Sequence, residues 1–381
     1  MRADGRWMGR ISLGHDSSGK HIRKAVYGKT LKEARDKADQ LAKEYESGLT
    51  VEKVGTVAEY LDQWIELDIK TRGSGNKTIS EYEDTVTRYV KPYIGHHSLK
   101  KLTSLQCRNW LVELTRKGFT PNMRKRAIRV FSVAMSAAVR ADLITRNPLQ
   151  GVPRPKVNRR HISPLSPDQC VELFKHCQTH RLGQLIIVAA LTGLRKGELF
   201  ALDWSDVNLR ERVITVRRSL EEVRGKLALK SPKTAAGRRA VLIDEVVRAA
   251  LVKRMDTAIA EGLPPAECPI VFPNNIGGHL RGNNFDRNVW YPIREAAGLP
   301  KTIRFHDLRH TQASLMLAAG VHPKVVQERL GHSDISLTLN TYSHLLNGLQ
   351  AEGVEKMAKL IQVSQTAADE ADKAEKESQN S

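Results

Sequence analysis

The sequence predicts a mainly α-helical, multidomain protein. Its N-terminal residues indicate a small β-hairpin plus helix unit, its middle an all-α domain, and its C-terminal half a mixed α+β domain of helices with a small antiparallel sheet. Three observations lead to this prediction. The 381 residues suffice for two or three domains. Residues 6–13 alternate between apolar and polar side chains, and residues 54–150 repeat apolar side chains at helical spacing.

The N-terminal unit begins with a predicted strand over residues 6–13. Its side chains fall on two faces, with Trp7, Ile11 and Leu13 on one and Arg6, Arg10 and Ser12 on the other. A turn at residues 16–19 leads to a second strand over about residues 21–27, which carries Arg23 and Lys24. The pair Thr30 and Glu33 has the spacing of a capping box and predicts that a helix starts there.

Residues 54–150 predict several helices. The first has apolar positions from Val57 to Ile65, a second starts at a capping box of Thr78 and Glu81, and a third covers about residues 105–114. The last repeats Ile128, Phe131, Met135 and Ala138 on one face. Basic side chains gather on this last helix at Arg124, Lys125 and Arg129. Such a run is usually a solvated face, but few acidic residues lie among them, which favours contact with DNA.

The next segment, residues 151–164, predicts an extended basic linker. Its prolines are unsuited to a helix interior, and its cations are suited to a phosphate backbone: Arg154, Lys156, Arg159 and Arg160. A plain spacer between domains is the alternative interpretation.

Composition agrees with a nucleic-acid partner. The formal net charge of +19 and the pI near 9.8 predict binding to a polyanion, although a basic soluble protein without such a partner would share them. The four cysteines form no Cys-x-x-Cys pair and are expected to be reduced thiols. Neither a long apolar segment nor a signal peptide is evident, so we expect neither a membrane-spanning nor a secreted protein.

Six residues in the second half of the chain have the chemistry needed to act on a phosphodiester: Arg195, Lys233, His306, Arg309, His332 and Tyr342. Arginine neutralises non-bridging oxygens through two parallel hydrogen bonds. Tyrosine can serve as a nucleophile if its proton is removed, and lysine or histidine can return a proton to the leaving oxygen.

Several of these residues also have a less specific interpretation. Arg195 could cap the helix that begins beside it, although a cation is poorly placed there. Lys230 competes with Lys233, both being expected on or near a hairpin turn between strands 227–230 and 239–243. His306 and His310 have the spacing of two metal ligands. Tyr291 is a competing tyrosine, but Pro292 after it suits a packed loop.

The runs around these residues, in their order, resemble the tyrosine recombinase (phage integrase) family. They are Thr-Gly-Leu-Arg-Lys-Gly-Glu-Leu, Pro-Lys-Thr, His-Asp-Leu-Arg-His-Thr, Leu-Gly-His-Ser and Thr-Tyr-Ser-His. The resemblance is strong over residues 165–346 and looser over residues 54–150. Any one run is common, whereas five in this order are specific.

The resemblance implies a role for each residue. Tyr342 would be the nucleophile that joins a 3′-phosphate of DNA, and Arg195 and Arg309 would clamp the scissile phosphate. Lys233 would protonate the leaving 5′-oxygen, His306 would act in acid/base transfer, and His332 would donate to the phosphate. Glu198 would hold Arg195 in place. Neither a metal nor ATP would be required, because the phosphotyrosyl link retains the energy of the broken bond.

The resemblance also implies a domain organisation. Residues 1–50 would be an arm-type DNA-binding domain, residues 54–150 a SAM-like core-binding domain, residues 151–164 the linker and residues 165–346 the catalytic domain. In residues 347–381 we expect a helix with Val354, Met357, Ala358 and Ile361 on one face, and then a disordered charged tail. Arm-type domains usually have three strands and only two are predicted, so a plain structural hairpin is the alternative.

The implied function is integration of a phage or other mobile element, with excision as a further activity, by a homotetramer on double-stranded attachment sites in the bacterial cytoplasm. Whether a DNA-bending host factor and an excisionase take part stays open, as does docking of the C-terminal helix in cis or in trans. A resolvase or invertase would use the same residues, as would a type IB topoisomerase. A catalytically idle DNA-binding regulator of the same fold is the alternative from another class.

Overall fold

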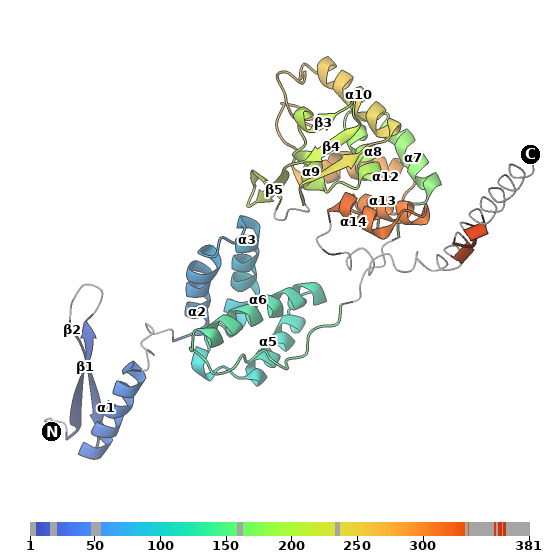
Figure 1. Cartoon of the computed structure of the whole chain (residues 1–381). Helices are drawn as coiled ribbons and strands as arrows, with labels where there is room; N and C mark the ends of the chain where they lie inside the picture. Colours follow the sequence, from blue (N-terminus) through green and yellow to red (C-terminus); the bar gives the residue numbers. More distant parts are fainter. Residues whose placement is uncertain are drawn as a thin grey trace, which may run out of the picture. The chain divides into compact units, whose positions relative to one another are not determined.

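The computed structural model describes residues 5–15, 21–46, 55–157, 163–232, 237–331, 334, 354–355, 357–359 and 361–362 (Figure 1). The chain divides into two compact units, Met1–Arg159 and Arg160–Ser381. Among the described residues helices predominate and the sheets are small and antiparallel. The predicted mainly α, multidomain fold class is therefore confirmed.

The N-terminal β-hairpin and helix are present as predicted. Strands β1 (Trp7–His15) and β2 (His21–Gly28) pair antiparallel, with Ser12 opposite Arg23, and α1 (Leu31–Glu46) packs against both. The Thr30 hydroxyl accepts a hydrogen bond from the Glu33 N–H at 3.1 Å, as its predicted cap role requires. The predicted turn at residues 16–19 lies outside the described residues.

The rest of the first unit is helical. Its α-helices are α2 (Val57–Trp64), α3 (Asn76–Thr85), α4 (Lys91–Ile94), α5 (Ser104–Arg116) and α6 (Pro121–Arg140), with π-helical turns at Ile65–Lys70 and Val86–Val90 and a 3-10 turn at Leu99–Lys101. The four predicted apolar positions of α6 are all buried. The Trp110 indole, which packs edge-on against Phe131, also donates to the Tyr89 carbonyl at 2.7 Å.

One predicted helix start is wrong. The capping box at Thr78 and Glu81 is not used, because α3 already begins at Asn76 with Gly75 at its N-cap. The N–H groups of Thr78 and Ile79 both donate to the Gly75 carbonyl, at 2.8 and 3.1 Å. Thr78 therefore lies inside the first turn rather than before it.

The second unit mixes helices and short strands. Its helices are α7 (Pro167–Cys177), α8 (Gly183–Thr192), α9 (Lys196–Phe200), α10 (Glu245–Ala260), α11 (Gly282–Phe285), α12 (Tyr291–Ala296), α13 (Asp307–Ala318) and α14 (Pro323–Leu330), with a 3-10 turn at Trp204–Asp206 and a π-helical turn at Asp286–Trp290. Its described strands are β3 (Val207–Asn208), β4 (Val213–Val216), β5 (Ser219–Val223), β6 (Lys226–Lys230) and β7 (Arg239–Leu242).

The predicted hairpin between residues 227–230 and 239–243 is wrong in its pairing. Both strands exist, but β6 pairs with β5, and β7 pairs with β4 in a sheet of order β3-β4-β7. The tight turn Arg224-Gly225, with both residues at positive φ, closes β6 onto the preceding strand instead. The segment from β6 to β7 thus connects two sheets.

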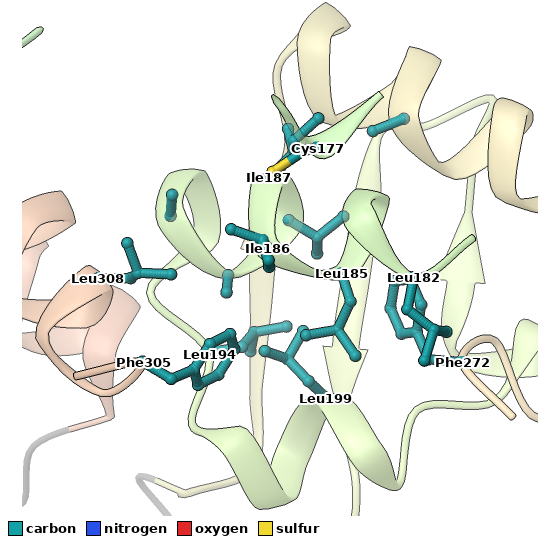
Figure 2. Packing of buried hydrophobic residues seen from close by; sticks show 14 of the residues in the cluster. Cys177, Leu182, Leu185, Ile186, Ile187, Leu194, Leu199, Phe272, Phe305 and Leu308 are labelled. Carbon is teal, nitrogen blue, oxygen red and sulfur yellow. The ribbon is translucent and has the colours of Figure 1, made fainter. Parts of the chain in front are cut away.

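Helix α8 forms the centre of the second unit. Its residues are almost all buried, and α7, α10 and α13 pack around it, as expected for a helix that is apolar on every side. Figure 2 shows Leu185, Ile186 and Ile187 of α8 among Leu194, Leu199, Phe305 and Leu308. The core therefore fixes α8, which ends shortly before Arg195, and the start of α13, which carries Arg309.

All four cysteines are buried and unpaired. Burial raises the pKa of the Cys107 and Cys177 thiols to about 12 and that of Cys170 to about 11. No described helix is both long and apolar enough to cross a membrane.

Candidate active site

Arg195 stands at the junction between α8 and α9. Gly193 ends α8 in the left-handed conformation, at φ 69°, and Arg195 takes the N-cap position of α9. A guanidinium has no acceptor atom and cannot cap a helix. Instead the Glu198 carboxylate accepts from the Arg195 N–H and from its Nη1, both at 2.8 Å. The Arg195 side chain is nevertheless 40% exposed, so its guanidinium is fixed by Glu198 and still accessible to a ligand.

Arg309 is tied to the same turn. It lies in the first turn of α13 and is buried, with Nη1 donating to the Gly193 carbonyl at 2.7 Å and Nη2 to the Leu330 carbonyl at 2.6 Å. A Cβ at Gly193 would come within 2.8 Å of the Leu330 side chain. Glycine at position 193 is therefore required both for its backbone conformation and for the close approach of α14.

Three arginines converge on the last turn of α14. The successive carbonyls of Arg329, Leu330 and Gly331, here called the α14 carbonyl row, accept from Arg239 Nε at 2.6 Å, Arg309 Nη2 at 2.6 Å and Arg195 Nη2 at 3.1 Å. Carbonyls at a helix C-terminus lack intrahelical partners and carry partial negative charge. The row thus brings Arg195 and Arg309 to adjacent anchors, and the residue after Gly331 is His332.

Glu198 is the acidic member of this site. Besides Arg195 it accepts from Arg239 Nη1 at 3.1 Å and Nη2 at 2.9 Å. Burial works to raise the pKa of Glu198, but the hydrogen bonds and charges of Arg239, and then of Arg195, outweigh it and hold the pKa below its usual value. Glu198 is therefore an anionic anchor between the two arginines.

His306 directly precedes α13, one turn before Arg309, and its ring meets that of His310 edge-on at 5.4 Å between centroids. Burial, followed by the neighbouring His310 and Arg309, lowers the pKa of His306 to about 4, and burial also lowers that of His310. Both rings are neutral at pH 7, as a proton acceptor must be. Among the described residues, no group of three or more His, Cys, Asp or Glu side chains is arranged to hold a metal ion.

The remaining predicted catalytic residues, Lys233, His332 and Tyr342, lie outside the described residues. Their competitors are described. Lys230 forms an ion pair with Glu221 across the β5–β6 hairpin. Tyr291 starts α12 rather than lying in a packed loop, because a proline is well tolerated in the first turn of a helix. The Arg294 guanidinium lies over its ring, 4.9 Å from the centroid.

The predicted DNA-contacting residues that the structure describes are mostly exposed. On the N-terminal hairpin, Arg10 and Arg23 share the face opposite α1, while Lys24 pairs with Ile11 on the other face. Arg6, just before β1, lies over the Tyr27 ring at 5.9 Å.

On α6, Lys125 and Arg129 are exposed one turn apart, whereas Arg124 donates to the Thr115 hydroxyl at 2.5 Å and is partly buried. Arg154 and Lys156 are exposed; Arg159 and Arg160 lie outside the described residues.

Sequence reasoning missed Arg239 and the α14 carbonyl row. Arg239 had a usable signal, since it shares the strand face of Val241, which is buried in the core. A charged residue at such a position needs a buried partner. The α14 carbonyl row had no signal in the sequence, because every residue has a backbone carbonyl.

Comparisons with known proteins agree with this geometry. The model of the phage integrase family matches residues 163–348, and that of the phage integrase N-terminal SAM-like domain matches residues 56–115. A tyrosine recombinase XerC-like protein of Caldanaerobacter subterraneus subsp. tengcongensis is 27% identical over 375 residues, which span 92% of this chain and 95% of the relative. The ICEBs1 integrase of Bacillus subtilis is 24% identical over 371 residues, spanning 94% and 98%.

Solved structures share the fold. The Tn1549 transposon integrase in complex with a circular intermediate DNA superposes with a TM-score of 0.69 at 22% identity, covering 80% of this chain and 99% of that one. A lambda integrase tetramer bound to a Holliday junction gives 0.58 at 18% identity, covering 90% and 93%. The two family-model matches, together with integrase relatives that span nearly the whole chain, show that the chain belongs to the phage integrase family and is a tyrosine-type site-specific DNA recombinase.

Proposed function

We propose that this recombinase integrates a phage or other mobile element by cutting and rejoining DNA through Tyr342. The observation that carries the proposal is the pair Arg195 and Arg309, anchored on adjacent carbonyls of α14 with one guanidinium still exposed. Two fixed cations side by side suit one phosphate that gains negative charge in the transition state. Their anchors are already in place, so little reorganisation is needed when DNA binds.

Proton transfer falls to the surrounding residues. Neutral His306 takes part in removing the tyrosine proton, Lys233 protonates the leaving 5′-oxygen, and His332 donates to the phosphate. The attacking phenolic oxygen forms a bond to phosphorus while the bond from phosphorus to the 5′-oxygen breaks. Rejoining reverses these steps with a new 5′-hydroxyl. No bond energy is lost to water, so the reaction proceeds without metal or ATP.

The working form we propose is a homotetramer on two attachment sites in the bacterial cytoplasm. The tetramer is supported by Val354, Met357 and Ile361 of the expected C-terminal helix, each of which is more than half exposed. An apolar helix face of this kind suits docking on a neighbouring protomer. A DNA-bending host factor and an excisionase are optional partners in this proposal.

Residues 1–50 serve as an arm-type DNA-binding domain in this proposal. Support comes from the exposed Arg10 and Arg23 on the hairpin face opposite α1, and from exposed Arg6 just before β1. Deletion of residues 1–50 should leave cleavage of a crossover site intact and weaken binding to DNA sites away from it. Unchanged binding to those distant sites in a gel-shift titration would reject the arm assignment.

The test of the function compares wild type with Tyr342→Phe. Each protein is incubated with a supercoiled plasmid library of genomic fragments from the source element, the reaction is stopped with detergent, and covalently bound DNA is isolated. We expect wild type alone to recover one enriched sequence, the core site. Capture spread over unrelated sequences would indicate a topoisomerase-like activity instead, and equal capture by the mutant would exclude Tyr342 as nucleophile.

A further inference from the structure

Arg239 occupies an unusual position for an arginine. It is the first residue of β7 and pairs with Val216 of β4, two places before buried Val241 on the same strand face. Its side chain is only 6% exposed. A core-facing strand position normally takes an apolar residue, since a buried charge is costly unless it is fully paired.

The pairing of Arg239 is nearly complete and spans two elements. Two of its terminal nitrogens donate to the two oxygens of Glu198, at 3.1 and 2.9 Å, and its Nε donates to the Arg329 carbonyl at 2.6 Å. With the two bonds from Arg195, Glu198 accepts four hydrogen bonds, which fills the capacity of a carboxylate. Neither Glu198 oxygen is then free to turn toward another donor.

We propose that Arg239 is a positioning residue of the active site, holding Glu198 against Arg195 and holding the last turn of α14 against both. This proposal rests on the proposed function. Three parts of the site meet through this one side chain: the support of Arg195, the carbonyl row that anchors Arg309, and the strand that follows the segment with Lys233. Arg239 need not touch DNA to act, because it fixes where the exposed guanidinium of Arg195 stands.

The fork geometry of Arg239 is essential to this role. A lysine would keep the charge but could not bridge both Glu198 oxygens and the Arg329 carbonyl at once. Glu198 and the α14 terminus would then move independently. An error of about 1 Å in the position of a catalytic group can slow a reaction by about 100-fold.

The chain offers a matched control in Arg254. It is fully buried in the same unit and donates to Glu261 at 2.8 Å and to the carbonyls of Val271 and Arg181 at 3.1 and 3.3 Å. Arg254→Lys therefore makes the same chemical change in a similar environment. It lies outside the proposed catalytic machinery.

The experiment measures covalent attachment in a single turnover, at saturating core-site DNA and below the melting temperature of each variant. For Arg239→Lys we expect the rate to fall by about 10- to 100-fold, with the half-saturating DNA concentration within a few-fold of wild type. Arg254→Lys should lower the melting temperature but keep the rate per folded molecule. The double variant Glu198→Gln with Arg239→Lys should lose less rate than the product of the two single losses, because both changes break the same contact between Glu198 and Arg239.

The outcomes separate the two proposals. Three results would overturn the role of Arg239 and leave the proposed function intact. They are a wild-type rate in folded Arg239→Lys, an equal loss of rate in Arg254→Lys, and full additivity of the two losses in the double variant. Absence of covalent DNA with wild type would instead overturn the proposed function, and the role of Arg239 in it.

Discussion

Two clusters in the second unit have nearly the same composition and different consequences. In each, one glutamate accepts hydrogen bonds from two arginines: Glu198 from Arg195 and Arg239, and Glu261 from Arg181 and Arg254. Each also contains one arginine that is almost completely buried. A pair of arginines on a glutamate is therefore not by itself a sign of function in this molecule.

The difference lies in where the other arginine points. Arg181 is 24% exposed, and its three nitrogens donate to Glu261 and to the Pro273 carbonyl. Arg195 is 40% exposed, and its neighbour on the α14 carbonyl row is a second arginine, Arg309. The arginines of the Glu261 cluster hold a loop to α10, whereas the Glu198 cluster leaves the Arg195 guanidinium exposed, with buried Arg309 on the adjacent carbonyl. The convergence of Arg195 and Arg309 on neighbouring carbonyls of α14 is the feature that separates the candidate site from the Glu261 cluster, which is a structural bridge.

The largest effect on cleavage should come from replacing the exposed arginine of the active site, Arg195. Arg195→Lys loses the planar donor set but keeps a charge, so we expect cleavage to fall by about 10²- to 10³-fold. Arg181→Lys, the same change in the other cluster, should stay within about two-fold of wild type in rate per folded molecule. Single-turnover cleavage of core-site DNA measures both, and similar losses would remove the distinction between the clusters.

A smaller effect should come from the glycine beside each glutamate. A Cβ at Gly197 would lie 2.6 Å from both the Leu220 carbonyl and the Ser219 hydroxyl, so Gly197→Ala must displace α9 from β5. We expect about a tenfold slower cleavage from the shifted Arg195. At Gly262 a Cβ meets nothing within 4 Å, but φ is 72°, so Gly262→Ala should cost about 1–2 kcal/mol of stability and leave cleavage unchanged. Urea unfolding beside the cleavage assay separates the two results.

The last comparison concerns the stability of the folded protein in acid. The folded pKa of His306 lies near 4, below its ordinary 6.5, so the unfolded chain binds more protons between these values and stability falls as pH drops from about 6.5 to about 4. His306→Asn should flatten that decline.

In the other cluster, burial works to raise the pKa of Glu261, but hydrogen bonds from Arg181 and Arg254 outweigh it and lower the pKa to about 2. Its stabilisation is complete above about pH 4.5 and is lost toward pH 2. Glu261→Gln should therefore lower the free energy of unfolding above about pH 4.5, and its difference from wild type should shrink as the pH falls toward 2. Urea unfolding across this pH range measures the difference, and a difference that stayed constant from about pH 6 to about pH 2 would contradict the assignment.

Patterns local in sequence were predictable. Alternation gave β1, and helical spacing found α6 with its four buried apolar positions, because period and burial are directly linked. The motif around Arg195 also located Glu198, three residues on in the same turn of helix. Strand pairing was not predictable, since β7 joins β4 across an intervening hairpin that residue spacing does not reveal.

The role of Arg239 in supporting the site could not be predicted from the sequence, for a related reason. Arg239 reaches Glu198 across 41 positions of sequence and the Arg329 carbonyl across 90. Thr78 shows the converse, a good local capping signal overridden because the turn at Gly75 had already started the helix. The contacts of Arg239 are long-range, and a single sequence does not display them, whereas the start of α3 is decided by local hydrogen bonds to the Gly75 carbonyl.

The central claim is that the Glu198 cluster, and not the Glu261 cluster, belongs to the DNA-cleaving site. The direct measurement is the single-turnover rate of covalent attachment to the captured core site for Glu198→Gln and Glu261→Gln, each at saturating DNA and well below its melting temperature. We expect Glu198→Gln to be about tenfold or more slower, because a neutral amide cannot hold two guanidinium groups. Glu261→Gln should match wild type. Equal rates for Glu198→Gln and wild type would contradict the account.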